Sequence, residues 1–230
     1  MTRTSEVDTV VLDVDGTLVD TVYLHTTAWV RAFADVGVVV PAWRVHRAIG
    51  MGGDRLVTEV AGEPTEAALG DEVRNRHGEH FEELINEARM LPGADELLET
   101  LMNRGFLVVL ASSGEEEQTD RLLSLVDGAG RAHARTSSDE ADRSKPAPDL
   151  VDAAIAKAGG ERAAVVGDAV WDVEAARAQG RPAIGLLCGG FGAAELRDAG
   201  AETVFCDPAD LVAHLDETVL AHAAATGAAR

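Results

Sequence analysis

The stretch VVLDVDGTLVD, residues 10–20, opens the chain with an apolar run that ends in two aspartates separated by one valine. Side chains alternate along a strand, so Asp13 and Asp15 are expected to project to the same side where the strand ends. Two carboxylates this close repel each other unless a cation or a shared proton compensates. Gly16 allows a tight turn, and Thr17 is available to hydrogen-bond the turn backbone. A charged turn at a strand end would leave the same pattern, so these residues alone leave both interpretations open.

Further along, from Pro92 onward, short apolar runs alternate with amphipathic stretches, and glycines stand at the joints. Runs such as FLVVLAS (106–112) and AAVVGD (163–168) predict buried strands, and the segments between such runs predict helices. Strands without hydrophobic alternation, separated by helices, are typical of a parallel sheet that is covered on both faces. The predicted fold class is therefore α/β, with a Rossmann-like parallel sheet as its core.

The first predicted strand is followed by a long gap, because the next strand-like run begins only near Phe106. A parallel crossover needs only about a dozen residues. The text in between is helical, which predicts an inserted all-helical cap of about four helices. We therefore expect a core of residues 1–19 and 89–230 and a cap of residues 20–88. Ligands of open parallel sheets bind at the carboxyl ends of the strands, so the cap would lie over that site as a lid.

The charge of the chain limits its partners. A formal net charge of −20, with 40 acidic and 20 basic side chains, repels nucleic acids and anionic membranes, so neither is an expected partner. An anionic substrate would need strong local positive charge, most simply a metal ion and one lysine.

The two cysteines and the hydropathy of the chain bear on where in the cell the protein is expected. Cys188 and Cys206 lie in or beside apolar runs, which predicts buried, reduced thiols. The N-terminus lacks the apolar region of a signal peptide, and no apolar run approaches the roughly 18 residues of a membrane span. We expect a soluble, cytoplasmic protein.

Polar side chains follow two other predicted strands, and Lys145 lies just before two prolines. Asp168 comes directly after a buried run, and Asp172 follows four residues later. If these strands are neighbours of the first, their carboxylates converge with Asp13 and Asp15 into a hard-oxygen cluster that suits magnesium. Three further candidates are Ser112, Ser113 and Lys145. Each of them alone is weak evidence for a site, because a serine before a helix is often an N-cap and a lysine is often solvated.

Taken together, four segments in this order resemble the motifs of the haloacid dehalogenase-like (HAD) superfamily: DVDGTLVD (13–20), VVLASSG (108–114), SKPAPD (144–149) and GDAVWD (167–172). The resemblance covers nearly the whole chain, including the position of the helical cap. Two cap segments, DTVYLHTTAW (20–29) and IGMGGDRL (49–56), resemble the phosphoglycolate phosphatase and β-phosphoglucomutase-like group.

This resemblance implies a magnesium-dependent phosphatase that acts on a small phosphorylated metabolite, as a monomer or a homodimer. Asp13 would be the nucleophile that forms an aspartyl-phosphate, and Asp15 would be the general acid and base. Ser112 and Lys145 would hold the phosphoryl oxygens. Magnesium would be bound by Asp13, the backbone carbonyl of Asp15 and Asp168, with Asp172 as a ligand directly or through water.

Cap residues have candidate roles at the substrate. His25 could contact the leaving group or set the protonation of Asp15, or it could only pack at the hinge. Other candidate substrate contacts are a serine of the second motif, two glycines that permit close approach and two arginines that could meet an anion: Ser113, Gly52, Gly53, Arg47 and Arg55. His77 and His80 have a spacing that zinc sites also use, but without a third ligand they predict a solvated helix face.

Three alternatives remain at this stage. A β-phosphoglucomutase-like sugar phosphomutase is the main one, although HGEHFEELINEARMLPG (77–93) lacks the cap lysine of such mutases and Gly167 stands where they carry a second metal-binding glutamate. A haloacid dehalogenase proper would not need Asp15 or the magnesium cluster. A non-enzymatic module switched by phosphorylation of Asp13 would have no use for a lid.

Overall fold

A six-stranded parallel sheet forms the centre of the computed structural model, which describes residues 7–137, 145 and 149–223. The strand order is β5-β4-β1-β6-β7-β8, and every neighbouring pair is parallel. The strands are β1 (Thr9–Asp13), β4 (Leu107–Ala111), β5 (Ala134–Thr136), β6 (Ala163–Gly167), β7 (Ala183–Leu186) and β8 (Thr203–Phe205).

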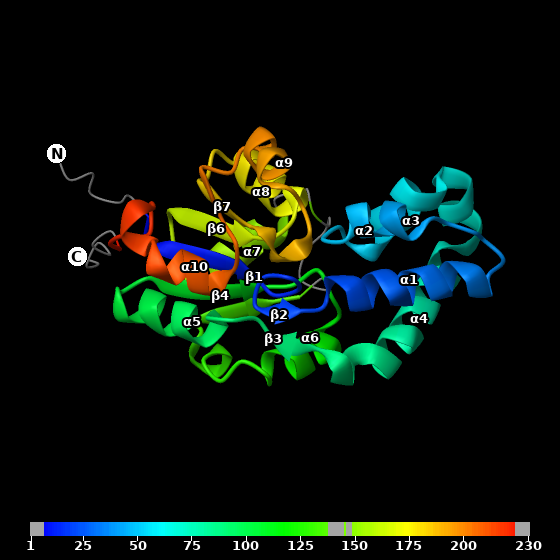
Figure 1. Cartoon of the computed structure of the whole chain (residues 1–230), viewed down its shortest axis with the longest axis horizontal. Coiled ribbons are helices and arrows are strands. Elements are labelled where there is room, and N and C mark those ends of the chain that lie inside the picture. The colour runs from blue at the N-terminus through cyan, green and yellow to red at the C-terminus, as the bar shows by residue number, and fades with distance from the viewer. Residues whose placement is uncertain (1–6, 138–144, 146–148, 224–230) are drawn as a thin grey trace.

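Helices cover both faces of this sheet (Figure 1). Val10 and Leu12 of β1 belong to one apolar cluster and Val11 belongs to the other, as the alternation of strand side chains requires. The first face carries α5 (Ala94–Asn103), α6 (Glu116–Leu123) and α10 (Pro208–Ala213). The second carries α7 (Asp149–Ala158), α8 (Val170–Ala178) and α9 (Ala193–Ala199). Short 3-10 turns complete the core at η2 (Ala129–Arg131), η4 (Leu187–Gly189) and η5 (Leu215–Glu217). The predicted α/β fold class is confirmed.

The helical insertion leaves and rejoins the core at a two-stranded antiparallel ribbon. β2 (Val19–Asp20) pairs with β3 (Arg89–Met90), and the chain between them forms helices only. These are α1 (Val22–Asp35), α2 (Ala42–Ala48), α3 (Gly53–Ala61), α4 (Glu63–Leu84) and the turn η1 (Ile85–Glu87). Figure 1 shows them as a unit that extends beyond one end of the sheet. The predicted inserted helical cap is confirmed.

An apolar cluster of its own stabilises this helical unit. Trp29 and Phe33 of α1 lie four residues apart on the buried face and are at most 5% exposed. Leu56 and Val57 of α3 pack in the same cluster. Phe81 of α4, in contrast, joins the cluster that covers the sheet, so the insertion is packed onto the core as well as onto itself.

Two details differ from expectation. β5 was not predicted, because the segment around it, RAHARTSS (131–138), is polar and the strand holds only an edge position beside β4. The prediction of buried cysteines is wrong for Cys206, which is exposed, while Cys188 is half-buried; both are free thiols.

Within the ranges that the structure describes, no helix has the length and apolarity to cross a membrane.

Because β1 lies in the middle of the sheet, its side chains carry a large share of the core. Leu12 is fully buried, so Leu12→Ala should lower the free energy of unfolding by about 2–5 kcal/mol, since it leaves a cavity. The control Val39→Ala, at a side chain that is 95% exposed, should change it by less than about 0.5 kcal/mol. Urea denaturation measures both, and equal effects would contradict this account of the core.

Candidate active site

The carboxyl ends of β1, β4 and β6 bring the predicted residues to one edge of the sheet. β1 ends at Asp13, and its register places Asp13 beside Ala111, directly before Ser112. On the other side of β1, β6 ends at Gly167, directly before Asp168. The parallel arrangement thus aligns three motifs that are far apart in the sequence.

Lys145 is the buried cation of this edge. Its side chain is 3% exposed, and its ammonium group donates to Asp13 Oδ1 and lies 2.7 Å from Asp172 Oδ1. Burial alone would lower the pKa of Lys145, but the charges of Asp13 and Asp172 outweigh this effect and raise it. Lys145 is therefore held as a cation between two carboxylates.

Close backbone approaches make room for the carboxylates. Gly16 has a φ of 81°, and a Cβ there would lie 2.3 Å from Asp168 Oδ2. A Cβ on Gly167 would lie 2.4 Å from the carboxylate of Asp172, whose Oδ2 accepts a hydrogen bond of 3.1 Å from the amide of Ala169. Glycine is thus required at both positions for the aspartates to occupy the places they have.

Thr17 orients Asp168. Its hydroxyl donates to Asp168 Oδ1 at 2.8 Å across 151 residues of sequence, so the prediction that it would bond the turn backbone was wrong. Thr17 is fully buried, and Asp168 is 3% exposed. The turn after β1 therefore fixes a carboxylate that the chain supplies much later.

Three carboxylates at this edge have the composition of a metal site. One oxygen each of Asp13, Asp168 and Asp172 lies within 4.8 Å of the others. Burial, followed by the neighbouring carboxylates, raises the pKa of Asp168 well above its ordinary value. When all three carboxylates are ionised, Lys145 balances one of the three negative charges and leaves two, which a divalent cation would balance. An all-oxygen, buried donor set of this kind suits Mg²⁺.

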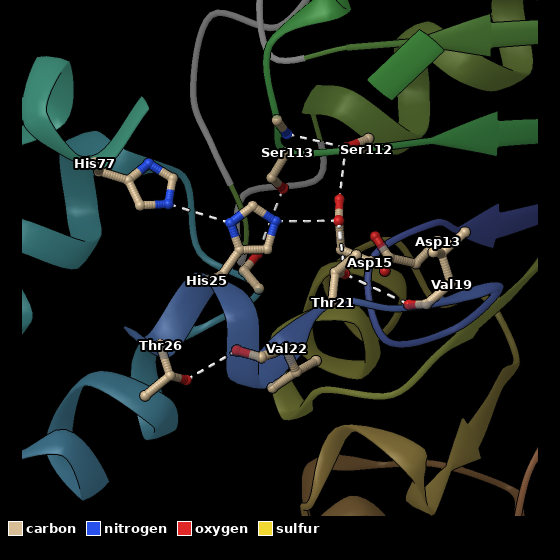
Figure 2. Close-up of polar contacts among 12 residues, drawn as sticks. Asp13, Asp15, Val19, Thr21, Val22, His25, Thr26, His77, Ser112 and Ser113 are labelled. Carbon is tan, nitrogen blue, oxygen red and sulfur yellow. Dashed lines mark hydrogen bonds and ion pairs between the residues drawn. The ribbon is translucent and has the colours of Figure 1, made fainter. Parts of the chain in front are cut away.

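Asp15 has different surroundings from the other aspartates (Figure 2). Its Oδ1 accepts from the hydroxyl of Thr21 at 2.8 Å and contacts Nε2 of His25 at 3.2 Å, and its Oδ2 accepts from the hydroxyl of Ser112 at 2.9 Å. Burial raises the pKa of Asp15, but the hydrogen bonds, led by that of His25, outweigh it and lower the pKa to about 2. Asp15 is thus an ionised carboxylate that the helical unit and the core hold jointly.

Ser112 is positioned by the strand beside it. Its amide donates to the carbonyl of Thr136 at 3.1 Å, and its hydroxyl accepts from the amide of Gly114 at 3.0 Å. Ser113 reaches the helical unit instead, because its hydroxyl lies 3.4 Å from the carbonyl of Gly50. The second motif thus contacts both Asp15 and the cap.

His77 was predicted on a solvated helix face, and this is wrong. Its Nε2 lies 3.1 Å from Nδ1 of His25, and its ring stacks on Trp29 with 4.0 Å between centroids. The signal that could have found it is spacing: His25 and Trp29 are four residues apart on α1, as His77 and Phe81 are on α4. His80, three residues further along α4, pairs with Asp35 at 2.8 Å.

Arg47 joins the helical unit to the core. Its guanidinium lies 2.5 Å from Glu195 Oε1 and 4.0 Å from the ring centre of Phe191. Its carbonyl accepts from the indole of Trp171 at 3.2 Å. His46 adds a contact of 3.0 Å with the carbonyl of Gly189. Sequence reasoning missed these core partners of the cap.

The other cap candidates lie at the start of α3. Gly52 precedes the helix and is buried, and the carbonyl of Gly53 lies 3.4 Å from Arg74. Arg55 is half-buried, and no hydrogen bond or ion pair within the described part of the chain connects it to the aspartates. The proposed substrate contacts of Gly52, Gly53, Arg47 and Arg55 stay predictions.

This fold and site define an α/β protein with a buried aspartate cluster beneath a helical insertion. Residues 7–180 match the family model of the haloacid dehalogenase-like hydrolases. The chain belongs to this family and is an enzyme of the hydrolase class.

Individual relatives agree with this assignment. A hydrolase from Pseudomonas syringae is 35% identical, with a TM-score of 0.86 over 91% of this chain and 98% of that one. A provisionally named phosphatase of Dickeya dadantii, IndB, is 28% identical over 78% of this chain and 81% of its own length. A provisionally named β-phosphoglucomutase from Bacteroides vulgatus shares the fold, with 21% identity and a TM-score of 0.82 over 97% of this chain and 93% of that one.

Metal binding to the cluster should depend on pH. In the metal-free protein, burial raises the pKa of Asp13 to about 8, with Lys145 opposing the rise and Asp172 and Asp15 adding to it. Below this pH a proton occupies the carboxylate and Mg²⁺ must displace it. The apparent affinity for Mg²⁺ should therefore rise by at least about tenfold per pH unit below about pH 8, and Asp168, whose pKa burial also raises, adds to this slope. Calorimetric titration measures this; a flat profile, or one unchanged in Asp13→Asn, would contradict it.

Proposed function

We propose that this enzyme is a magnesium-dependent phosphatase that hydrolyses a small phosphomonoester through an aspartyl-phosphate on Asp13. The observation that carries the proposal is the pairing of two carboxylates two residues apart in unlike surroundings. Asp13 lies between Lys145 and the aspartate cluster, and Asp15 lies among neutral hydrogen-bond donors and His25. Such a difference separates a nucleophile from an acid and base.

In the first step, a carboxylate oxygen of Asp13 attacks phosphorus, and the bond from phosphorus to the ester oxygen breaks. Asp15 gives its proton to the leaving oxygen, which departs as an alcohol. The hydrogen bonds to Asp15 lower its pKa to about 2, but an arriving phosphate brings negative charge close to it, which favours the protonated form. Lys145 and Ser112 hold the phosphoryl oxygens.

In the second step, Asp15 takes a proton from water, and the oxygen of that water attacks phosphorus. The bond between phosphorus and Asp13 then breaks, which returns the carboxylate and releases inorganic phosphate. Asp15 regains the proton that it gave in the first step, so the cycle is balanced.

Mg²⁺ would be held by the carboxylates of Asp13, Asp168 and Asp172, with the backbone carbonyl of Asp15 as the further ligand that the family resemblance implies. When bound, it supplies positive charge that offsets the charge of the phosphoryl oxygens. The fit rests on the donor set, which is all oxygen, buried and two positive charges short of neutrality.

Residues 20–88 act as a cap over a core of residues 1–19 and 89–230 in this proposal. The contacts of Ser113 with Gly50 and of Trp171 with the Arg47 carbonyl hold the cap against the strand ends. Such closure excludes water other than the reacting one and selects the substrate by shape.

Phosphate release from a panel of small phosphomonoesters tests the proposal. Asp13→Asn removes the nucleophile and should lower phosphate release by more than about a thousandfold. The matched control is Asp20→Asn, which changes an exposed aspartate of the same motif and should retain activity. EDTA should abolish turnover and added Mg²⁺ should restore it. Metal-independent turnover, or activity that survives in Asp13→Asn, would refute the mechanism.

A β-phosphoglucomutase-like activity is the second candidate, since a protein of that name shares the fold. Gly167 weighs against it, because it stands where such mutases are expected to carry a second metal-binding glutamate. A side chain at this position would collide with Asp172 in its present place. With β-glucose 1-phosphate and Mg²⁺, phosphate should therefore appear faster than glucose 6-phosphate. A coupled assay for glucose 6-phosphate beside a phosphate assay decides this, and the reverse order would favour the mutase.

A further inference from the structure

Two histidines connect Asp15 with the interior of the helical unit (Figure 2). His25 of α1 contacts Asp15 Oδ1 through Nε2 at 3.2 Å, and its Nδ1 lies 3.1 Å from Nε2 of His77. His77 belongs to α4 and lies 52 residues along the chain from His25. Asp15, the candidate acid and base, is thus linked through the imidazole of His25 to α4, a helix that supplies none of the clustered aspartates.

Stacked rings hold both imidazoles in place. His25 lies against Phe81 with 3.8 Å between ring centroids and an interplanar angle of 13°. His77 lies against Trp29 with 4.0 Å between centroids and an angle of 14°. Phe81 is fully buried and Trp29 is 5% exposed. Because the rings are packed on their faces, their edges, and therefore their nitrogen atoms, have little freedom to turn.

The hydrogen bonds of Asp15 determine which nitrogen carries a proton. Asp15 accepts from the hydroxyls of Thr21 and Ser112, and its Oδ1 faces the Nε2 of His25, so Nε2 is the nitrogen placed to donate to it. In the neutral tautomer with its one N–H on Nε2, the Nδ1 of His25 is an acceptor. The Nε2 of His77 is then the donor. Burial lowers the pKa of His77 well below its ordinary value, which keeps this second ring neutral.

We propose that His77 is a positioning residue for the reaction: its Nε2–H donates to Nδ1 of His25, holds His25 in the Nε2–H tautomer and thereby keeps a donor aimed at Asp15. This inference rests on the proposed function, in which Asp15 exchanges protons with the leaving group and with water. Because His25 and His77 come from different helices, the packing of α1 on α4 decides whether Asp15 has this donor.

Two variants separate the hydrogen bond from the packing. His77→Phe keeps a flat ring for the stack on Trp29 but has no donor, and His77→Gln places an amide N–H near the position of Nε2. With the best phosphomonoester, His77→Phe should lower kcat by about tenfold or more and change KM far less, as misoriented catalytic groups do. His77→Gln should stay within about threefold of the unaltered enzyme. His80→Gln, on the same helix, is the matched control.

A spectroscopic measurement on full-length, ¹⁵N-histidine-labelled protein tests the same inference without turnover. The His25 signals, identified by their loss in His25→Gln, should show a protonated Nε2 and an unprotonated Nδ1, and His77→Phe should shift them towards a mixture of tautomers. A protonated Nδ1 in the unaltered protein, an unchanged tautomer in His77→Phe, or equal losses of kcat in the Phe and Gln variants would overturn the role of His77. If the unaltered enzyme releases no phosphate at all, the proposed function fails, while the tautomer of His25 still decides the hydrogen bond.

Discussion

The arrangement at the strand ends depends on one electrostatic constraint: three buried carboxylates share a small volume with a single lysine. Asp13, Asp168 and Asp172 repel one another in a medium that screens charge poorly, and Lys145 compensates for only part of that charge. The parallel sheet supplies the strand ends that bring the aspartates together, and glycines such as Gly16 leave space for them. The carboxylates, whose burial together costs folding free energy, are the groups that would bind a divalent cation. That cation and Lys145 would then face a phosphoryl group.

Two aspartates of one turn differ because the chain gives them different neighbours. Burial raises the pKa of Asp13 to about 8, whereas His25 and two hydroxyls lower that of Asp15 to about 2 against its own burial. The difference comes from the helical unit, since His25 lies in the first turn of its first helix. The insertion therefore contributes to the chemistry of the turn as well as to its enclosure, and the hydrogen bond from His77 extends this influence to α4.

Beside the apolar packing of Phe81 on the core, several polar contacts join the helical unit to the core. Arg47 with Glu195, Trp171 with the Arg47 carbonyl and Ser113 with Gly50 each join residues more than 60 positions apart. Partly exposed pairs of this kind contribute modestly, typically about 0.2–1 kcal/mol each. In the proposed function, polar contacts of this modest strength would suit a cap that closes over a substrate and opens to release the product.

Local patterns were sufficient for the sheet, the helical insertion and the aspartate motifs, because strand and helix periodicity and the residues at strand ends are properties of neighbouring positions. The short edge strand β5 escaped prediction because its stability comes from pairing with β4 and not from its own side chains. The partner of Thr17, the contact of His77 with His25 and the pairing of Arg47 with Glu195 were decided only in the tertiary structure. Each depends on which distant segment packs alongside, and no pattern of adjacent residues carries that information.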